Sequence, residues 1–455
     1  MVRPDLTSRW RGYVWLVVAV LVCYANAMAG DFQFDDYKVI VDNPSVHSWD
    51  AWLHRAGQGM AGIRPLLKVS YVLNWTSGWG LVGFHAVNIG IHLANTVLVY
   101  LLARSFVSVS VTLSASHTPA LWSGVPLAAA LIFAVHPANT EAVTYICGRS
   151  SALMAMFYLA GVLLYTRAGN DDRAWQRHAG VPLCFALALM VKETAVTFPM
   201  ALLCWEWAAG TPARTMWRRQ WSSWLLLLLG AAFFLLNDSY LAHMQRSAEL
   251  NSLTGNLATQ ALAFFYLLRQ WATPFWINID PDLPVLKLAT QGIPYLAGLA
   301  LVMGLAVMAR RRRPWLAFAL AWAWVHLVPL YVFLPRLDVA NDRQLLLAGW
   351  PLGLGLVMAL ALHVEQKKLP MVLGAVLLCF AVLTIHRNNQ YATEIALWEA
   401  TVALSDGKAR VHNNLGYAYR LAGRNEDARR QYTRALELDP QHIKARYNLE
   451  RLDLP

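Results

Sequence analysis

The sequence predicts an all-α protein, in which a polytopic membrane helix bundle is followed by a short C-terminal module of paired helices. Three observations predict this class. Hydrophobic residues make up 57% of the 455 positions and charged residues only 14%, which is too little charge for a soluble domain of this length. Long apolar runs recur along the chain, separated by short basic clusters. After residue 386 these runs stop and a polar pattern with helical periodicity begins.

The apolar runs predict about eleven membrane spans when they are located with a window of about twenty residues. The first run is longer than the core of a typical signal peptide, so we interpret it as a retained anchor. The stretch 257–276 is apolar but lies between two loops on the same side, which predicts an interfacial or re-entrant helix. The expected spans lie near residues 12–29, 84–103, 120–136, 150–167, 179–191, 194–209, 221–237, 291–309, 315–333, 343–362 and 370–386.

Basic residues predict the orientation of these spans. Arg3, Arg9 and Arg11 place the N-terminus in the cytoplasm, and every second loop thereafter is basic, as at residues 310–313 and 367–368. Because the number of spans is odd, the first outer loop and the C-terminal module fall on the same non-cytoplasmic side. We therefore expect a membrane domain at 1–386, with its first outer loop at 31–83, and an outer module at 387–455.

The composition also argues against other classes of protein. The net charge of +11 would suit a nucleic-acid partner, but the basic residues gather beside apolar spans, where they set topology. We expect no nucleic-acid partner. The cysteines have neither metal-ligand spacing nor the pattern of a disulfide framework, so no metal site is predicted. They are Cys23, Cys147, Cys184, Cys204 and Cys379.

The C-terminal module matches the tetratricopeptide consensus, a 34-residue repeat of two antiparallel helices. The match covers residues 409–442, and flanking segments resemble further half-repeats. One repeat with two halves is below the roughly three needed for independent stability, so the module is expected to lean on the membrane domain. Its concave face is a candidate surface for binding an extended peptide. The alternative is that the module only caps the membrane domain or holds two copies of the protein together. The candidate acceptor-binding residues are Arg410, Asn413, Tyr417 and Arg420.

Two adjacent acids, Asp35 and Asp36, follow the first span almost immediately. An enzyme that joins a lipid-tailed substrate to a soluble one needs its chemistry at this membrane boundary. One such reaction is glycosyl transfer from a lipid-phosphate donor to an acceptor hydroxyl. The phosphate leaves without protonation, so one carboxylate that acts as general base on the hydroxyl can suffice, together with cations that stabilise the phosphate oxygens. The alternative for the acid pair is a helix cap or a turn. The candidate phosphate-binding cations in or beside outer loops are Arg64, Arg149, Lys192 and Arg343.

Further polar residues interrupt the apolar pattern on the same side. His85, Asn88, His92 and Asn95 form one stripe of the second span, which predicts either a hydrophilic cavity or hydrogen bonds to neighbouring helices. Glu141 can face the same water-filled pocket as His136, or it can simply oppose a helix dipole. Glu193 either has a functional role in the pocket or simply lies in the loop between two spans. The candidate pocket-lining residues are His85, His136, Glu141 and Glu193.

Together these motifs resemble, in the same order, the transmembrane and tetratricopeptide-repeat family of protein O-mannosyltransferases, a branch of the GT-C glycosyltransferases. The resemblance extends over most of the chain. The motifs that carry it are Phe34-Asp35-Asp36, Asn43-Pro44, Arg64-Pro65-Leu66, Gly83-Phe84-His85 with Asn88 and His92, His136-Pro137 with Glu141-Ala142-Val143, Gly148-Arg149, Lys192-Glu193-Thr194 and the C-terminal repeat.

The resemblance implies a GT-C-like membrane enzyme that uses a polyprenyl-phosphate sugar as donor substrate, with a luminal or periplasmic active site. It assigns Asp35 the role of general base and Asp36 a role in positioning a substrate. The repeat array is shorter than in animal members, and the sequence shows no endoplasmic-reticulum retention signal. We therefore expect a bacterial inner-membrane enzyme with a periplasmic repeat module, for which mannose is one possible sugar.

Two alternatives stay open from the residues alone. The chain can be a non-catalytic membrane anchor that displays its repeat module for envelope assembly, in which case acids at the membrane boundary have no role. It can also be a glycosyltransferase whose acceptor is a lipid-linked glycan and not a protein hydroxyl. The sugar, the stereochemical outcome and any need for a divalent metal cannot be read from residue types.

Overall fold

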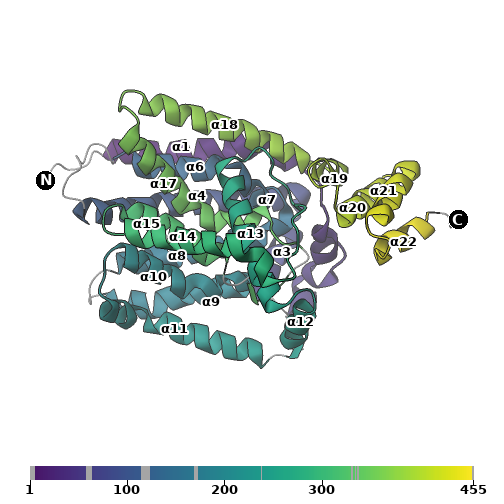
Figure 1. Cartoon of the computed structure of the whole chain (residues 1–455), viewed down its shortest axis with the longest axis horizontal. Helices are drawn as coiled ribbons and strands as arrows, with labels where there is room; N and C mark the ends of the chain where they lie inside the picture. The colour runs from purple at the N-terminus through teal and green to yellow at the C-terminus, as the bar shows by residue number, and fades with distance from the viewer. Residues whose placement is uncertain are drawn as a thin grey trace.

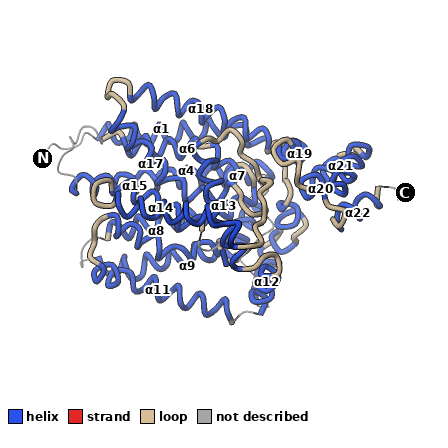
Figure 2. The backbone as a smooth tube through the Cα atoms, viewed as in Figure 1, coloured by secondary structure: helices blue, strands red, loops and turns tan. Residues whose placement is uncertain are grey.

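The computed structural model describes residues 6–57, 64–113, 123–168, 173–236, 238–328, 332–333, 335 and 338–452. Its regular elements are helices, and these described ranges contain no strand (Figure 2). The all-α class expected from the sequence is confirmed.

The long helices lie side by side along one direction of the molecule (Figure 1). They enclose a common apolar core, and several begin with proline at the first or second position, where the missing N–H costs no intrahelical bond. The bundle helices are α1 (Leu6–Tyr24), α4 (Gly80–Leu113), α6 (Val125–Val135), α8 (Arg149–Arg167), α9 (Val181–Val191), α10 (Phe198–Ala208), α11 (Ala213–Leu235), α14 (Ile293–Ala309), α15 (Pro314–Leu327), α17 (Leu345–His363) and α18 (Leu369–Gln390).

Within the described residues, six helices are long and apolar enough to cross a membrane, so the chain is an integral multi-pass membrane protein. Three shorter apolar helices accompany them, at Val125–Val135, Gln176–Val191 and Pro314–Leu327. The six are Trp10–Ala29, Gly80–Ser108, Ile146–Arg167, Thr290–Ala309, Asp342–His363 and Leu369–Gln390.

The expected spans near 194–209 and 221–237 correspond to α10 and α11, which belong to neither set. Helix α10 has 11 residues, so it is only about 16 Å long at 1.5 Å per residue, against about 30 Å of hydrocarbon. Helix α11 begins with three arginines in its first seven residues. For these two segments, a membrane crossing stays a prediction.

Burial separates the centre of the bundle from its periphery. The central span that contains α8 has 83% of its apolar window buried, whereas the windows of the spans containing α14 and α18 are 17% and 11% buried. Large apolar side chains such as Met308 on α14 and Leu378 on α18 therefore point outward. An outward apolar face of this extent is typical of helices that contact lipid.

At the end of the bundle nearer the C-terminus, the chain breaks repeatedly into short elements, which bring polar residues together. Helix α13 (Leu253–Ala272) crosses this end at a steep angle to the long helices (Figure 1) and is not among the six spanning candidates. The other short elements at this end are η1 (Ala25–Ala29), η2 (Tyr37–Val41), η3 (Pro44–Val46), α2 (Trp49–Gly57), α3 (Pro65–Thr76), η4 (Pro137–Asn139), α7 (Thr140–Val143), η5 (Ile146–Gly148), η8 (Glu193–Thr197), α12 (Asp238–Ala248), η9 (Ala289–Gly292) and η10 (Asp342–Gln344). A further short element, η7 (Gln176–Gly180), lies between α8 and α9 at the opposite end.

The C-terminal module consists of α19 (Glu394–Val402), α20 (Ala409–Leu421), α21 (Asn425–Leu438) and α22 (Ile443–Glu450). Helices α20 and α21 approach closely at Gly416, where an added Cβ would come within 2.7 Å of the Tyr432 ring. The module lies beyond the bundle, at the opposite end from the N-terminus (Figure 1).

Charged contacts fix this module to the loop that follows α13. The carboxylate of Asp280 is buried and accepts hydrogen bonds from Lys408 Nζ at 2.7 Å and Arg410 Nε at 2.8 Å. The Nδ2 of Asn278 donates to Ser405 Oγ at 2.6 Å. These contacts hold the start of the repeat against the loop that follows α13; whether the module is stable without them stays a prediction.

Candidate active site

The segment that carries the two acids is held in an unusual backbone conformation. Phe34 has φ of 47°, in the left-handed region that a side chain other than glycine rarely adopts. Its ring packs edge-to-face on Trp398 of α19, with 5.3 Å between ring centroids. Strain of this kind persists only where the surroundings enforce it, and the two acids that follow lie in different environments.

Asp36 points into the protein and serves as an anchor. It is fully buried, and its two carboxylate oxygens accept hydrogen bonds from the backbone N–H groups of Gln33 at 3.0 Å and Cys147 at 2.8 Å. Burial raises the pKa of Asp36 from 3.8 to about 7, against the lowering effect of these hydrogen bonds. Asp36 therefore joins the first loop to η5 and positions its neighbour.

Asp35 is partly exposed and lines a pocket of about 140 Å³, which we call the acid pocket. Its backbone N–H donates to the hydroxyl of Tyr145 at 3.1 Å, which fixes the start of the acidic pair. The acid pocket is lined by Phe34, Asp35, Tyr145, Ile279, Asp280, Asp338, Arg343, Trp398 and Arg410. Of the two acids, Asp35 is thus the one with access to a ligand.

The raised pKa of Asp36 predicts a pH-dependent stability. Above pH 3.8 the unfolded chain releases this proton, whereas the folded protein keeps it until about pH 7, so the contribution of Asp36 to stability falls as the pH rises through this window. Between these pH limits the free energy of unfolding of the wild type should fall by up to about 4 kcal/mol relative to an Asp36→Asn variant, at about 1.4 kcal/mol per pH unit. Thermal unfolding of both proteins in detergent, followed from pH 4 to 8 by tryptophan fluorescence, measures this difference. Parallel stability profiles would contradict the prediction.

Arg343 supplies the positive charge in the acid pocket. Its Nε lies 3.1 Å from Oε1 of the buried Glu141, and its backbone N–H donates to the other oxygen, Oε2, at 3.0 Å. Nη2 lies 4.0 Å from Asp338 Oδ2. Glu141 therefore orients Arg343, and the arginine side chain remains 15% exposed toward the pocket.

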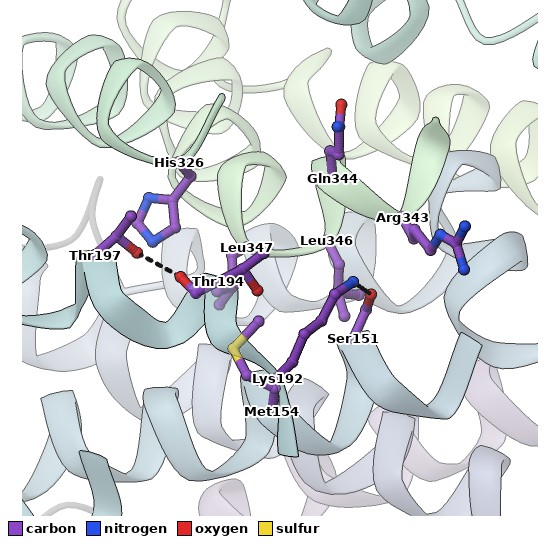
Figure 3. Close-up of a pocket in the computed structure, with 10 residues that line it drawn as sticks. All are labelled: Ser151, Met154, Lys192, Thr194, Thr197, His326, Arg343, Gln344, Leu346 and Leu347. Carbon is purple, nitrogen blue, oxygen red and sulfur yellow. Dashed lines mark hydrogen bonds between the residues drawn. The ribbon is translucent and has the colours of Figure 1, made fainter. Parts of the chain in front are cut away.

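Figure 3 shows a second cavity, to which Arg343 also contributes. Arg343 thus lines both this cavity and the acid pocket. This lysine cavity has a volume of about 30 Å³, and its lining includes Lys192, Thr194 and His326. Lys192 reaches across it and donates to Ser151 Oγ at 2.7 Å. Arg343 of η10 thus lines the pocket of Asp35 as well as the cavity that Lys192 borders.

Arg64 and Glu193 form an ion pair next to this region. Nε and Nη2 of Arg64 donate to Oε2 and Oε1 of Glu193 at 2.9 and 2.5 Å, in a bidentate arrangement. Burial would raise the pKa of Glu193, but the charge and hydrogen bonds of Arg64, with the charge of Lys192, lower it to about 2. Burial in turn lowers the pKa of Arg64, Glu193 raises it above its usual value, and the nearby charge of Arg343 opposes this rise. Arg64 therefore lies near Lys192 and Arg343, but its own charge is balanced by Glu193.

Arg149 lies elsewhere, inside the bundle. It is fully buried, and its guanidinium donates to Asn88 Oδ1 at 2.6 Å, Phe84 O at 3.0 Å and Ser70 O at 3.1 Å. The same group lies over the Tyr71 ring, 5.0 Å from its centroid. These bonds tie α3, α4 and α8 together, so the structure does not bring Arg149 to either cavity.

The histidines predicted to line the pocket make packing contacts. On α4, the polar stripe bonds to backbone oxygens of neighbouring elements: His85 Nε2 lies 2.9 Å from Gly30 O and His92 Nε2 lies 3.0 Å from Ala134 O. His136 Nε2 lies 3.0 Å from Trp271 O and stacks on that ring. Of the two alternatives for the stripe, hydrogen bonding between helices is the one observed.

The predicted acceptor-binding residues divide between two places. Asn413 and Tyr417 line an open groove between η2 and the repeat helices, and the guanidinium of Arg420 lies over the Tyr417 ring at 5.0 Å. Arg410 instead lines the acid pocket, where it pairs with Asp280. Helix α20 thus contributes to both.

Sequence reasoning missed Tyr145, Trp398 and Asp280 as parts of the acid pocket. A signal existed for Asp280: it stands in Asn278-Ile279-Asp280-Pro281-Asp282, an acidic stretch between apolar segments on the side already expected for Asp35. Tyr145 and Trp398 carry no such signal, because buried aromatic residues are ordinary in a membrane bundle. No group of three or more His, Cys, Asp or Glu able to hold a metal occurs in the part of the chain that the structure describes.

Comparison with known protein families identifies one segment of the chain. Residues 409–442 match the tetratricopeptide repeat family. The C-terminal module therefore contains a tetratricopeptide repeat, formed by α20 and α21. No solved structure matches the chain.

The whole chain is distantly similar to proteins named as O-mannosyl-transferases. It is 24% identical to such a protein of Caenorhabditis elegans, over 95% of this chain and 63% of that protein. It is 25% identical to protein O-mannosyl-transferase TMTC3 of Mus musculus, over 96% of this chain and 52% of that protein. TMTC4 of Homo sapiens is 32% identical over 39% of this chain and 26% of its own length. The chain thus spans between about half and two thirds of the length of the relatives that it matches from end to end.

Proposed function

We propose that the protein is a GT-C type membrane glycosyltransferase that moves a sugar from a polyprenyl-phosphate donor to a hydroxyl of a protein Ser or Thr, on the non-cytoplasmic face of the membrane. The observation that carries the proposal is the shared position of Arg343, which lines both the pocket of Asp35 and the cavity of Lys192. A carboxylate and two cations at one end of a membrane bundle are the minimal set for this transfer. Distant similarity to proteins named as O-mannosyl-transferases supports the same class.

In the proposed reaction the acceptor oxygen attacks the anomeric carbon of the sugar. The O–H proton passes to the carboxylate of Asp35, and the bond between the anomeric carbon and the phosphate oxygen breaks. The polyprenyl phosphate leaves with the bonding electron pair, and the charge that develops on it is stabilised by Arg343 and Lys192. Asp36 takes no proton in this scheme and holds the loop that presents Asp35.

The surrounding residues support these roles. Glu141 keeps Arg343 oriented through two contacts at 3.0 and 3.1 Å, so the guanidinium need not reorganise when charge develops. Arg64 and Arg343 are both paired with a carboxylate, Glu193 and Glu141 respectively. Because Arg343 lines both cavities and Arg64 lines neither, we assign direct phosphate contact to Arg343 and Lys192. Mannose is one sugar that fits the scheme, and undecaprenyl phosphate is the carrier expected in a bacterial inner membrane.

Reconstitution tests the proposal. The purified full chain in lipid nanodiscs is supplied with a synthetic polyprenyl-phosphate mannose and a pool of unstructured peptides that contain Ser or Thr, and mass spectrometry records peptide mass and released lipid phosphate. We expect peptides that gain one hexose and a stoichiometric amount of polyprenyl phosphate. Comparing periplasmic and membrane glycoproteins from cells with and without the protein identifies the natural sugar. Absence of any glycan difference between these cells, together with an inert reconstituted protein, would overturn the proposal and favour a scaffold.

A further inference from the structure

A groove of about 580 Å³ lies between the first loop and the tetratricopeptide repeat. We call it the tyrosine groove. One wall is η2, with Tyr37, and the other is formed by α20 and α22, with Tyr417 and Tyr447. Its volume lies in the range of about 300–1,000 Å³ that is usual for ligand sites.

We infer that the tyrosine groove binds the acceptor as an extended, unstructured polypeptide and leads its hydroxyl residue into the acid pocket. The inference rests on the proposed function and specifies its acceptor. Four observations on the groove carry it: its aromatic lining, its amide side chains, its balanced charge and its continuity with the pocket of Asp35.

The aromatic lining is specific to this surface. Among the tyrosines whose side chains the structure describes, three are exposed, namely Tyr37 at 38%, Tyr417 at 39% and Tyr447 at 55%. All three line the tyrosine groove. Tyrosine offers a rigid apolar face and a polar hydroxyl at low entropic cost, and it is therefore enriched where proteins bind other polypeptides.

Amide side chains occupy the space between the aromatic rings. Asn413, Asn414 and Asn448 line the groove, and they are linked by bonds from Asn448 Nδ2 to Asn413 Oδ1 at 3.0 Å and from Asn413 Nδ2 to Asn414 Oδ1 at 3.3 Å. A side-chain amide both donates and accepts, as a peptide group does. Such a row suits the backbone of an extended chain and does not depend on its side chains.

The charges in the groove do not favour a strongly acidic or basic ligand. Lys38 and Lys444 are balanced by Asp42 and Glu394. A phosphorylated or polyanionic ligand would meet two carboxylates, whereas a neutral polypeptide meets both signs at the rim. This distribution agrees with recognition of the backbone and with tolerance of varied sequences.

The groove continues toward the proposed general base. Phe34, next to Asp35 in the chain, lines both the tyrosine groove and the acid pocket. Helix α20 also borders both, with Tyr417 on the groove and Arg410 on the pocket. An extended chain advances about 3.3 Å per residue, so a segment of a few residues in the groove can place the next residue at Asp35.

The position of the groove separates this ligand from a lipid-linked one. Its second wall belongs to the repeat helices, which lie beyond the end of the membrane bundle (Figure 1). A substrate with a lipid tail approaches from the side of the bundle, where its tail stays in the membrane. We therefore assign the groove to a polypeptide and the bundle side to the donor.

Photo-crosslinking tests the binding without any need for the sugar donor. The photoreactive amino acid p-benzoyl-phenylalanine replaces Tyr447 in the full chain in nanodiscs, and the matched control replaces Ile443, which lies on the same helix, is 82% exposed and does not line the groove. The probe is a pool of synthetic peptides with a central Ser or Thr and randomised flanks. We expect peptide adducts at 447 and at least ten-fold fewer at 443. Equal labelling, or labelling of 447 only by a lipid-linked oligosaccharide, would overturn the inference.

Kinetics separate a failure of this inference from a failure of the proposed function. Tyr417→Ala and Tyr447→Ala should each raise KM for the peptide pool about ten-fold, the effect of losing one well-placed aromatic contact, and leave kcat and hydrolysis of the donor unchanged. Ile443→Ala should behave as the wild type. Unchanged KM in both tyrosine variants would refute the groove as acceptor site even where transfer occurs, whereas a protein with no transfer at all would refute the proposed function.

Discussion

Asp35→Asn is expected to lower kcat for sugar transfer by about 10²–10⁴-fold, the usual contribution of a general base. Asparagine preserves the shape of the side chain but cannot accept the proton of the acceptor hydroxyl. The hydrogen bond from the backbone of residue 35 to Tyr145 does not involve the carboxylate, so folding should be retained. The measurement is initial transfer rate at saturating donor and peptide, with the thermal midpoint as a check on folding.

Asp50→Asn is the matched control for this prediction. Asp50 is an exposed acid of the same outer loop, in the first turn of α2, and its replacement should leave the rate within two-fold of the wild type, as expected for a surface change. A folded Asp35→Asn protein that transfers sugar at the wild-type rate would exclude Asp35 as the base.

Arg343→Gln is expected to lower kcat by about 10²–10³-fold, comparable to the removal of one preorganised donor from a site that stabilises developing charge. Because Glu141 is buried and contacts Arg343 at 3.1 Å, this change also leaves a buried carboxylate without its partner, which typically costs about 3–5 kcal/mol. Loss of activity by this variant alone would therefore confuse a catalytic role with a structural one.

The double variant Arg343→Gln with Glu141→Gln resolves this ambiguity. Both charges are removed together, so the thermal midpoint should recover toward that of the wild type, while the rate of transfer stays low. Glu141→Gln alone retains the guanidinium and should lose less activity than either protein without Arg343. Recovery of both stability and rate in the double variant would show that Arg343 has only a structural role.

The helical class and the repeat could be predicted because they depend on local patterns. Apolar runs long enough to cross a bilayer and a 34-residue repeat consensus are both visible along the chain. The limit of this approach is seen at α10, where an apolar stretch divided by the extended backbone of Lys192 leaves a helix of 11 residues. Hydropathy counts such a stretch as a span, but its length is set by where the chain breaks.

The acids of the first loop were also predictable as a pair, but not in their separate roles. Adjacent residues with the same side chain differ here because the packing of distant segments encloses one acid, which accepts from the N–H groups of Gln33 and Cys147, and leaves the other facing the pocket. In the same way, Arg149 and Arg343 are equivalent as isolated arginines in outer segments. Only packing shows that the first is enclosed by Asn88, Ser70 and Phe84.

Local order in the chain was thus sufficient for a membrane bundle, an acidic loop at its boundary and a repeat module after its last helix, since each depends on hydrophobicity or on spacing between near neighbours. The acid pocket depends on contacts between residues far apart in the chain: Asp35, Arg343 and Arg410 come from three separate segments and line one pocket, where Arg410 pairs with Asp280. Burial and hydrogen bonding among these distant segments decide which arginine is buried, which acid is accessible and where the groove leads. Local sequence patterns cannot predict such long-range contacts.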